Sequence, residues 1–234
     1  MARVMVFIDG FNLYHSIKDQ IDPPPPDGPF PPKTPQPHFK QYKWLNLKKL
    51  MHLFVPKEDI IEEIYYFTTL AEWNRRKAAK HKKYIQALQN VGVKIVLGNF
   101  RKIFKKCNNC SSSFATHVEK KTDVNISVFM LQMAFTDKYD KAYLVSGDTD
   151  LVPVIESIKT NFPLKKVGVI SPMGRQNNEL RKVAHFQANI SEASLKDSMF
   201  DRVIQVDNTT QIECPHEWIT PPPTSFSGTN ISKK

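Results

Sequence analysis

The segment from Arg3 to Asn12 reads RVMVFIDGFN: a continuous apolar run followed by an aspartate, a glycine and an asparagine. Such a run is typical of a strand that is buried on both faces of a parallel sheet. A second segment, from Ala142 to Asp150, repeats the pattern and reads AYLVSGDTD. Ligands bind at the carboxyl ends of strands where an open parallel sheet changes direction. Acids about 140 positions apart in sequence are therefore expected to meet at one edge of the sheet.

Strand patterns alternate with helical patterns along most of the chain. The expected strands are 3–8, 61–68, 93–99, 142–145 and 166–170. The expected helices are 12–20, 46–54, 73–90, 122–135, 151–159 and 176–185. This alternation predicts an α/β fold in which right-handed crossovers build a mainly parallel central sheet.

The composition predicts one domain with two excursions. The chain has 234 residues, of which 41% are hydrophobic, and this suits a single core over residues 1–200. Segment 22–38 contains nine prolines and is expected to be an exposed, Pro-rich insertion, because proline lacks a backbone donor. A basic, Cys-containing loop is expected at 100–118. Residues 201–234 become polar and Pro-rich, so a C-terminal extension that is flexible in part is expected there.

Charge and hydropathy narrow the class of partner. The formal net charge of +10 favours a polyanionic partner. The opening apolar run is stopped by Asp9, and no run approaches the roughly 20 apolar residues that span a bilayer. The three cysteines suit reduced thiols or a metal site better than a disulfide framework. The sequence thus predicts a cytoplasmic protein that does not enter a membrane.

Three short motifs together resemble a known family. They are Asp9-x-x-Asn12, the helix entry Lys120-Lys121-Thr122-Asp123, and the block Ser146-Gly147-Asp148-Thr149-Asp150. In this combination, over roughly residues 3–190, the chain resembles the NYN domain, the LabA-like branch of the PIN-like nuclease superfamily. The Ser-Gly-Asp-x-Asp block is the most specific of the three. The resemblance implies a Rossmann-like (PIN-like) three-layer fold, with the Pro-rich and Cys-containing segments outside the minimal domain.

The same resemblance implies a nuclease site. It assigns Asp9, Asp123, Asp148 and Asp150 to a four-acid pocket that binds divalent metal and cleaves RNA, with Asn12 and Ser146 as polar neighbours. Independent chemistry favours such a set, because Mg²⁺ and Mn²⁺ prefer carboxylate oxygens and activate water for phosphodiester hydrolysis. Each acid also has a structural alternative. Asp9 is suited to capping the helix that follows, Asp148 and Asp150 to acting as a cap and a dipole partner, and Asp123 to standing in the first turn of a helix that Thr122 caps.

Basic residues predict where a nucleic acid binds. They gather on the expected helix 73–90 and before the cysteine pair, with Phe100 and Phe104 interleaved, and lysine and arginine contact phosphates while aromatic rings stack on unpaired bases. The alternative is an ordinary solvated face. The candidate contacts are Arg75, Arg76, Lys80, Lys83, Arg101, Lys102, Lys105, Lys106 and Lys121.

The spacing Cys107-Asn108-Asn109-Cys110 offers half of a structural zinc site. Such a site needs four ligands. His117 is the nearest further donor, and Cys214 with His216 would contribute only if the C-terminal extension folds back. Two loop thiols that bind no metal are the alternative.

The sequence therefore predicts a metal-dependent ribonuclease that uses Mg²⁺ or Mn²⁺, with a structural Zn²⁺ as a further option and single-stranded or structured RNA as the partner. An interaction module that keeps the pocket but has little or no catalysis is the alternative. A phosphatase of the haloacid dehalogenase type would need an acid two places after Asp9, where Phe11 stands. A homo-oligomer is left open.

Overall fold

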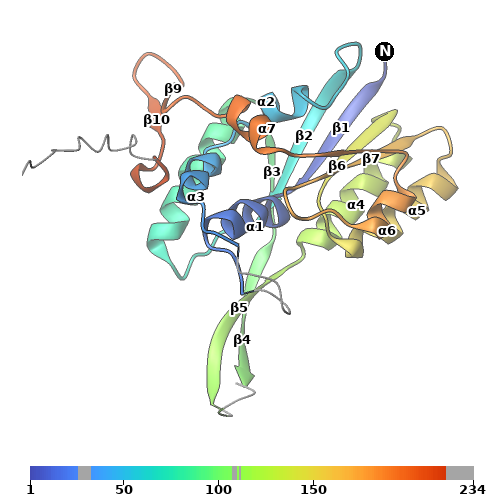
Figure 1. Cartoon of the computed structure of the whole chain (residues 1–234). Coiled ribbons are helices and arrows are strands. Elements are labelled where there is room, and N and C mark those ends of the chain that lie inside the picture. The colour runs from blue at the N-terminus through green and yellow to red at the C-terminus, as the bar shows by residue number, and fades with distance from the viewer. Residues whose placement is uncertain (26–32, 107–109, 111, 220–234) are drawn as a thin grey trace, which may run out of the picture.

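The computed structural model describes residues 1–25, 33–106, 110 and 112–219. Its centre is a six-stranded sheet in the order β3-β2-β1-β6-β7-β8, in which every neighbouring pair is parallel (Figure 1). The strands are β1 (Arg3–Asp9), β2 (Ile60–Thr68), β3 (Lys94–Leu97), β6 (Lys141–Val145), β7 (Lys166–Ser171) and β8 (Phe186–Asn189). The predicted parallel α/β fold is confirmed.

Helices cover both faces of this sheet. They are α1 (Gly10–Ile21), α2 (Leu47–His52), α3 (Arg75–Asn90), α4 (Thr122–Phe135), α5 (Val152–Asn161), α6 (Asn178–Val183) and α7 (Glu192–Asp197). Short 3₁₀ turns are η1 (Pro37–Lys43), η2 (Thr149–Leu151) and η3 (His216–Trp218).

The side chains of β1 show why three layers form. Successive residues of a strand point to opposite faces. Val4, Val6 and Ile8 join the core under α1, α2, α3 and α7, whereas Met5 and Phe7 join the core under α4, α5 and α6. Because both faces are buried, the strand must be apolar throughout, and this is the pattern that the sequence shows.

The order of the strands places a switch point beside β1. The chain runs from β1 to β2 and β3 on one side, then returns to β6, which pairs with the free edge of β1, and continues to β7 and β8. The carboxyl ends of β1 and β6 are therefore neighbours at the place where the topology changes direction, which is the usual ligand crevice of open α/β sheets.

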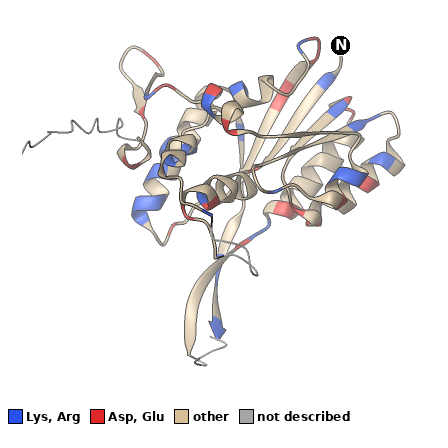
Figure 2. Ribbon diagram, in the orientation of Figure 1, with Lys and Arg blue, Asp and Glu red and all other residues tan. Residues whose placement is uncertain are grey.

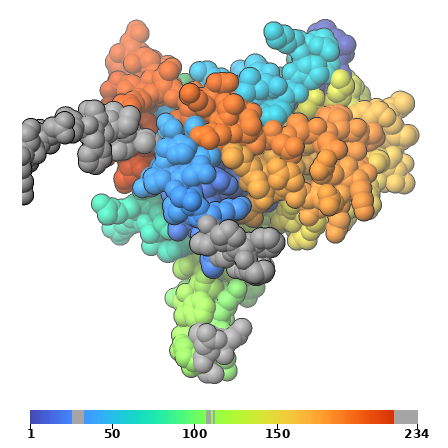
Figure 3. Space-filling model, viewed as in Figure 1, coloured from blue at the N-terminus to red at the C-terminus, as the bar shows by residue number. Residues whose placement is uncertain are grey.

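Two further strands form an arm that leaves the body. β4 (Asn99–Lys106) and β5 (Ser113–Lys120) pair in antiparallel register, from Asn99 opposite Lys120 to Lys106 opposite Ser113, and project away from the sheet (Figures 1 and 3). At its base, Phe100 contacts Phe11 with ring centroids 5.4 Å apart, and the His117 ring stacks on Trp73 at 3.7 Å. The segment that was expected as a basic, Cys-containing loop at 100–118 is thus a regular hairpin in its described part.

Several elements differ from the sequence prediction. β8 and α7 were not predicted, because both are short and carry polar residues that break any apolar run. Of the Pro-rich segment 22–38, residues 26–32 lie outside the described part, and its end starts η1, for which Pro37 is suited as the first helical residue.

The described part of the C-terminal extension packs on the body. β9 (Val203–Gln205) and β10 (Gln211–Glu213) form a small antiparallel hairpin. Trp218 then lies 6.3 Å from Trp44 and 6.2 Å from Tyr84, measured between ring centroids. Among the helices of the described residues, none combines the length and the apolar character needed to cross a membrane.

Candidate nuclease site

Asp9 ends β1 and is almost completely buried, with 2% of its surface exposed. One carboxylate oxygen, Oδ1, accepts a hydrogen bond of 2.9 Å from the Asn12 backbone N–H, which caps α1. The other, Oδ2, accepts one of 2.8 Å from the Ser146 hydroxyl. The capping role and the pocket role are therefore compatible, because each uses a different oxygen of the same side chain.

The residues that follow β6 complete this network. The Gly147 backbone N–H donates to Oδ1 of Asn12 at 3.0 Å, and the Asp148 N–H donates to the Ser146 hydroxyl oxygen at 3.1 Å. Oδ1 of Asp148 in turn accepts from the Asp150 N–H at 3.0 Å. Two segments far apart in sequence are thus joined by hydrogen bonds at the switch point.

Both glycines in these motifs are required by close approach of the backbone. A Cβ on Gly10 would lie 2.5 Å from the Phe67 carbonyl oxygen, where α1 starts directly above β2. A Cβ on Gly147 would clash with the Arg175 carbonyl oxygen. Because glycine has no Cβ, Gly10 can lie close to the backbone of Phe67 and Gly147 close to the backbone of Arg175.

Asp123, the third of the predicted acids, lies in the first turn of α4. The residue that precedes this helix, Lys121, has a φ of 78°, a left-handed conformation that is uncommon for a residue other than glycine. Glu119, at the end of the arm, accepts hydrogen bonds from both the backbone N–H and the hydroxyl of Thr122. The entry to α4 is therefore held by the arm as well as by the sheet.

The electrostatics connect all four predicted aspartates. Burial, helped by the charge of Asp148, raises the pKa of Asp9 to about 6 against the opposing effect of the Asn12 and Ser146 hydrogen bonds. Burial also raises the pKa of Asp123 to about 6, and the further causes are the negative charges of Asp9, Asp148, Glu119 and Asp150. The structure thus gathers the carboxylates closely enough for them to repel one another.

This donor set suits a hard divalent cation, because its free groups are carboxylate oxygens and its mutual repulsion is relieved by positive charge. In the described residues, however, no three His, Cys, Asp or Glu side chains stand close enough together to enclose an ion. The chemistry of the donors fits a metal, and closing around one requires movement of the exposed side chains.

Glu119 is the acidic neighbour that the sequence reasoning missed. Its position three residues before Thr122 offered a signal, since an acid at this distance can accept from the first backbone N–H groups of a helix. The signal was hidden because Glu119 belongs to the arm, whose contact with the helix entry depends on the tertiary fold.

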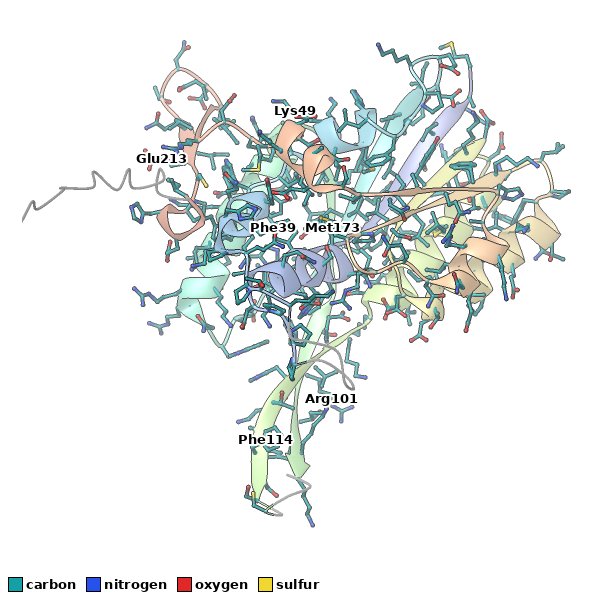
Figure 4. The ribbon with its side chains drawn as sticks, viewed as in Figure 1. Phe39, Lys49, Arg101, Phe114, Met173 and Glu213 are labelled. Atoms are coloured by element: carbon teal, nitrogen blue, oxygen red, sulfur yellow. The ribbon has the colours of Figure 1, made fainter. Side chains whose placement is uncertain are left out.

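The predicted basic contacts fall into two groups on the structure. Lysines and arginines are spread along α3 (Figure 2). Arg75, Arg76 and Lys83 are exposed there, whereas Lys80 pairs with Glu217 at 3.1 Å. Arg101, Lys102, Lys105 and Lys106 are exposed on the arm, and Lys121 is exposed at its end. Figure 4 shows Arg101 and Phe114 on the projecting arm, and Phe104 there is 72% exposed, with the Lys102 ammonium 5.6 Å from its ring centroid.

The further zinc ligands that were predicted do not come together. Cys107 lies outside the described residues, and Cys110 lies in the turn of the arm. His117 stands four residues beyond the start of β5, about 13 Å along a strand, and its ring is stacked on Trp73.

Cys214 follows β10 and packs against the core, and the described part of the C-terminal extension, up to residue 219, lies on the body beside α3 (Figure 1). Burial raises the pKa of the Cys214 thiol to about 11, and this favours the thiol over the thiolate that zinc binds. Cys107 lies outside the described residues, so the zinc site stays a prediction, and no group of three metal-ligating side chains is found among the described residues.

Comparison with known proteins places the chain in a family. The NYN domain model matches residues 3–191. The chain also resembles 6-hydroxy-3-succinoylpyridine 3-monooxygenase of Pseudomonas putida, with 31% identity over 91 residues, but spans only 29% of that protein. A crystal structure of a protein of unknown function from Vibrio parahaemolyticus shares the fold, with a TM-score of 0.55 at 16% identity, covering 85% of this chain and 96% of the other.

The family match extends from the first strand to the end of the sheet and includes every motif of the switch point. The chain therefore belongs to the NYN domain family, within the PIN-like nuclease superfamily.

Proposed function

We propose that this protein is a metal-dependent ribonuclease whose active site is formed by Asp9, Asp123, Asp148 and Asp150, with Asn12 and Ser146 as supporting groups. The observation that carries the proposal is the hydrogen-bonded link from Asp9 through Ser146 to Asp148 across the switch point. The NYN family belongs to a superfamily of nucleases, and this membership supports nucleic-acid cleavage as the reaction. The LabA-like branch remains part of this proposal.

The aspartates would hold Mg²⁺ or Mn²⁺, which when bound supplies Lewis-acid stabilisation of phosphate charge and lowers the pKa of water. Asp9 provides the buried anchor of the group, because its two oxygens are already oriented by Asn12 and Ser146. Asp123, Asp148 and Asp150 are more exposed than Asp9 and would face the substrate phosphate.

RNA is the proposed substrate, and the arm and α3 would position it. Their exposed lysines and arginines contact phosphates without reading sequence, and the exposed Phe104 and Phe114 offer rings on which unpaired bases stack. The alternative, an interaction module with a silent pocket, has the same binding surface and differs only in turnover.

Substitution of Asp148 by Asn tests the proposal. Cleavage of single-stranded RNA, duplex RNA and DNA would be measured with Mg²⁺, Mn²⁺ or EDTA. We expect RNA cleavage that EDTA abolishes and that Asp148→Asn lowers by at least ~100-fold, since losing a few kcal/mol of charge stabilisation costs roughly tenfold per 1.4 kcal/mol.

The matched control is Asp197→Asn, an exposed aspartate at the end of α7, which should leave the rate unchanged. A wild type that cleaves none of the three substrates with either metal would support the interaction module instead. Equal rates for Asp148→Asn and wild type would remove these acids from the mechanism.

A further inference from the structure

A cavity of about 340 Å³ lies between α1 and α3, next to the acidic site. Gly10, which follows Asp9 directly, forms part of its wall, and so does Tyr66, whose pKa is raised by burial and also by the charge of Asp9. The volume falls in the range of about 300–1,000 Å³ that is usual for small-ligand sites. The cavity therefore opens beside the acids at the same edge of the sheet.

The walls are aromatic. Tyr14, Tyr66, Tyr84 and Trp218 contribute to the lining, and Trp73 and Phe100 meet there edge to face with centroids 4.5 Å apart. Trp73 is 49% exposed, so part of this aromatic surface faces solvent. Rings arranged in this way accept a flat aromatic ligand by stacking or by edge-to-face contact.

The charge of the lining is entirely positive. Lys43, Lys77 and Lys80 line the cavity, and no carboxylate does so among the described residues, although Lys80 is paired with Glu217 just outside the lining. Burial and the charges of Lys80, Lys40, Lys18 and Lys77 lower the pKa of Lys43 to about 8. An anion placed beside Lys43 would relieve this repulsion, and Lys43 already lies 5.1 Å from the Tyr14 ring centroid.

A few polar groups interrupt the apolar wall. His81 Nε2 lies 3.2 Å from the Thr68 hydroxyl, and burial lowers the pKa of His81 to about 4, so the ring is neutral at pH 7. The buried Thr69 hydroxyl has no hydrogen-bond partner in the described part of the chain. The Thr69 hydroxyl lies beside Gly98, as does the Thr122 hydroxyl, so the Thr68 and His81 pair supplies the polar groups that the edge of a ligand in the cavity would meet.

We propose that this cavity binds an unpaired nucleotide, with the base between the aromatic walls and the phosphate at the lysines. A nucleotide joins a flat ring with hydrogen-bonding edges to an anion. The aromatic walls match the ring, the polar groups match its edges, and the lysines match the anion. The inference rests on the proposed function, because a nucleotide held here belongs to a strand that passes the acids, although a free nucleotide has the same chemistry.

Equilibrium binding tests this inference without any cleavage. The four nucleoside 5′-monophosphates would be titrated by calorimetry in EDTA, with nicotinate as an aromatic carboxylate that lacks ribose and phosphate. We expect at least one nucleotide to bind and nicotinate to bind at least tenfold more weakly. Failure of all four nucleotides to bind, or tighter binding of nicotinate, would overturn the proposal.

Two pairs of variants locate the binding. Ala71→Phe fills the cavity, and its control Ala79→Phe places the same ring on the exposed side of α3. Lys43→Met removes a half-buried ammonium that lines the cavity, and its control Lys40→Met removes an exposed one from the same 3₁₀ turn.

We expect Ala71→Phe and Lys43→Met to weaken nucleotide binding at least tenfold, and the controls to leave it within twofold. Circular dichroism confirms that each variant is folded. If Ala71→Phe does not fold, the Lys43→Met and Lys40→Met pair decides. Equal loss in a variant and its control would place the nucleotide elsewhere and overturn the inference.

Oligonucleotides separate the two sources of nucleotide. A short single-stranded RNA and the same strand with one abasic position would be compared by fluorescence anisotropy in wild type and Ala71→Phe. Weaker binding of the abasic strand, in wild type alone, assigns the cavity to a base within RNA. Equal binding of both strands assigns it to free nucleotides. Cleavage without nucleotide binding contradicts only this inference, and nucleotide binding without cleavage contradicts only the proposed ribonuclease.

Discussion

At the scale of single residues, Asp9 combines a structural and a chemical task. Its carboxylate caps α1 and holds Ser146, yet burial raises its pKa to about 6. A group that has a higher pKa when folded favours the folded state when protonated and opposes it when ionised. At neutral pH the ionised Asp9 therefore lowers the free energy of unfolding as long as no cation is bound beside it.

This predicts a pH-dependent effect of magnesium on stability. The pKa values of Asp9 and Asp123 rise from 3.8 to about 6 on folding, so in EDTA these groups lower the free energy of unfolding as pH increases through that interval. Mg²⁺ at 100 times its Kd should restore about 2.7 kcal/mol at pH 7.5 and much less at pH 5. Thermal denaturation at both pH values measures this.

The control is the double variant Asp9→Asn, Asp123→Asn, which should lose most of the magnesium effect at pH 7.5. An equal stabilisation by Mg²⁺ at pH 5 and pH 7.5 in wild type would contradict the link between the acids and the ion.

Lys121 offers a second test at this scale, because its backbone and its charge can be separated. Lys121→Gly keeps a left-handed φ without strain, and should stabilise the fold by roughly 0.5 kcal/mol, since relief of about 1–2 kcal/mol exceeds the flexibility cost of about 0.4–1 kcal/mol. Lys121→Ala keeps the strain. Chemical denaturation compares the two variants.

If the Lys121 ammonium contacts a phosphate, both variants should weaken RNA binding by the same factor, although their stabilities differ. Unchanged RNA affinity in both would make Lys121 a solvated surface charge.

At the scale of elements, α3 is the clearest candidate for a phosphate-binding surface. Triple substitution of the exposed Arg75, Arg76 and Lys83 by Gln should flatten the salt dependence of RNA binding. Each lost phosphate contact on a single strand removes about 0.7 from the log–log slope, so three contacts account for about 2. Lys80 is left in place because it pairs with Glu217.

Fluorescence anisotropy over a salt series measures this slope. The control is Lys138, Lys182 and Lys196 replaced by Gln, which removes the same charge from exposed positions outside α3 and the arm. A slope that changes equally in both triple variants would indicate general attraction by the net charge of +10 rather than contact at α3.

At the scale of the whole molecule, the C-terminal extension completes the body. Trp218 lies against Trp44 and Tyr84, and both of these are buried. Trp218→Ala should lower the free energy of unfolding by about 1–2 kcal/mol, less than the 3–5 kcal/mol typical of a fully buried tryptophan, because Trp218 is only partly buried.

Urea denaturation of the full chain measures this effect. Substitution of Trp73, which is 49% exposed, by Ala is the control for losing a tryptophan from the surface, and should cost less. No loss of stability in Trp218→Ala would mean that residues 201–219 contribute nothing to the folded unit.

The sequence by itself determined the layered α/β fold and the position of Asp9 and Asp148 at the carboxyl ends of neighbouring strands of the sheet. The buried stretches Val4 to Ile8 of β1 and Ala142 to Val145 of β6 are hydrophobic because both faces of the sheet are covered, so their pattern reveals a parallel sheet without knowledge of its neighbours. The acids follow directly at the strand ends, and the rule that switch points collect ligands was enough to bring Asp9 and Asp148 together. The helix α4 begins and ends at the predicted residues, 122 and 135, so its bounds are also set by the local sequence.

The tertiary structure alone decided the cavity and the role of Glu119. The cavity is lined from α1, α3, β2, the arm and η3, and no spacing within one segment signals such an assembly. His117 is a candidate ligand by its position in the sequence, and only the fold reveals that its ring is stacked on Trp73. Local patterns arise from the chain's own periodicity, whereas contacts between distant segments depend on packing, which the sequence encodes only through the whole fold.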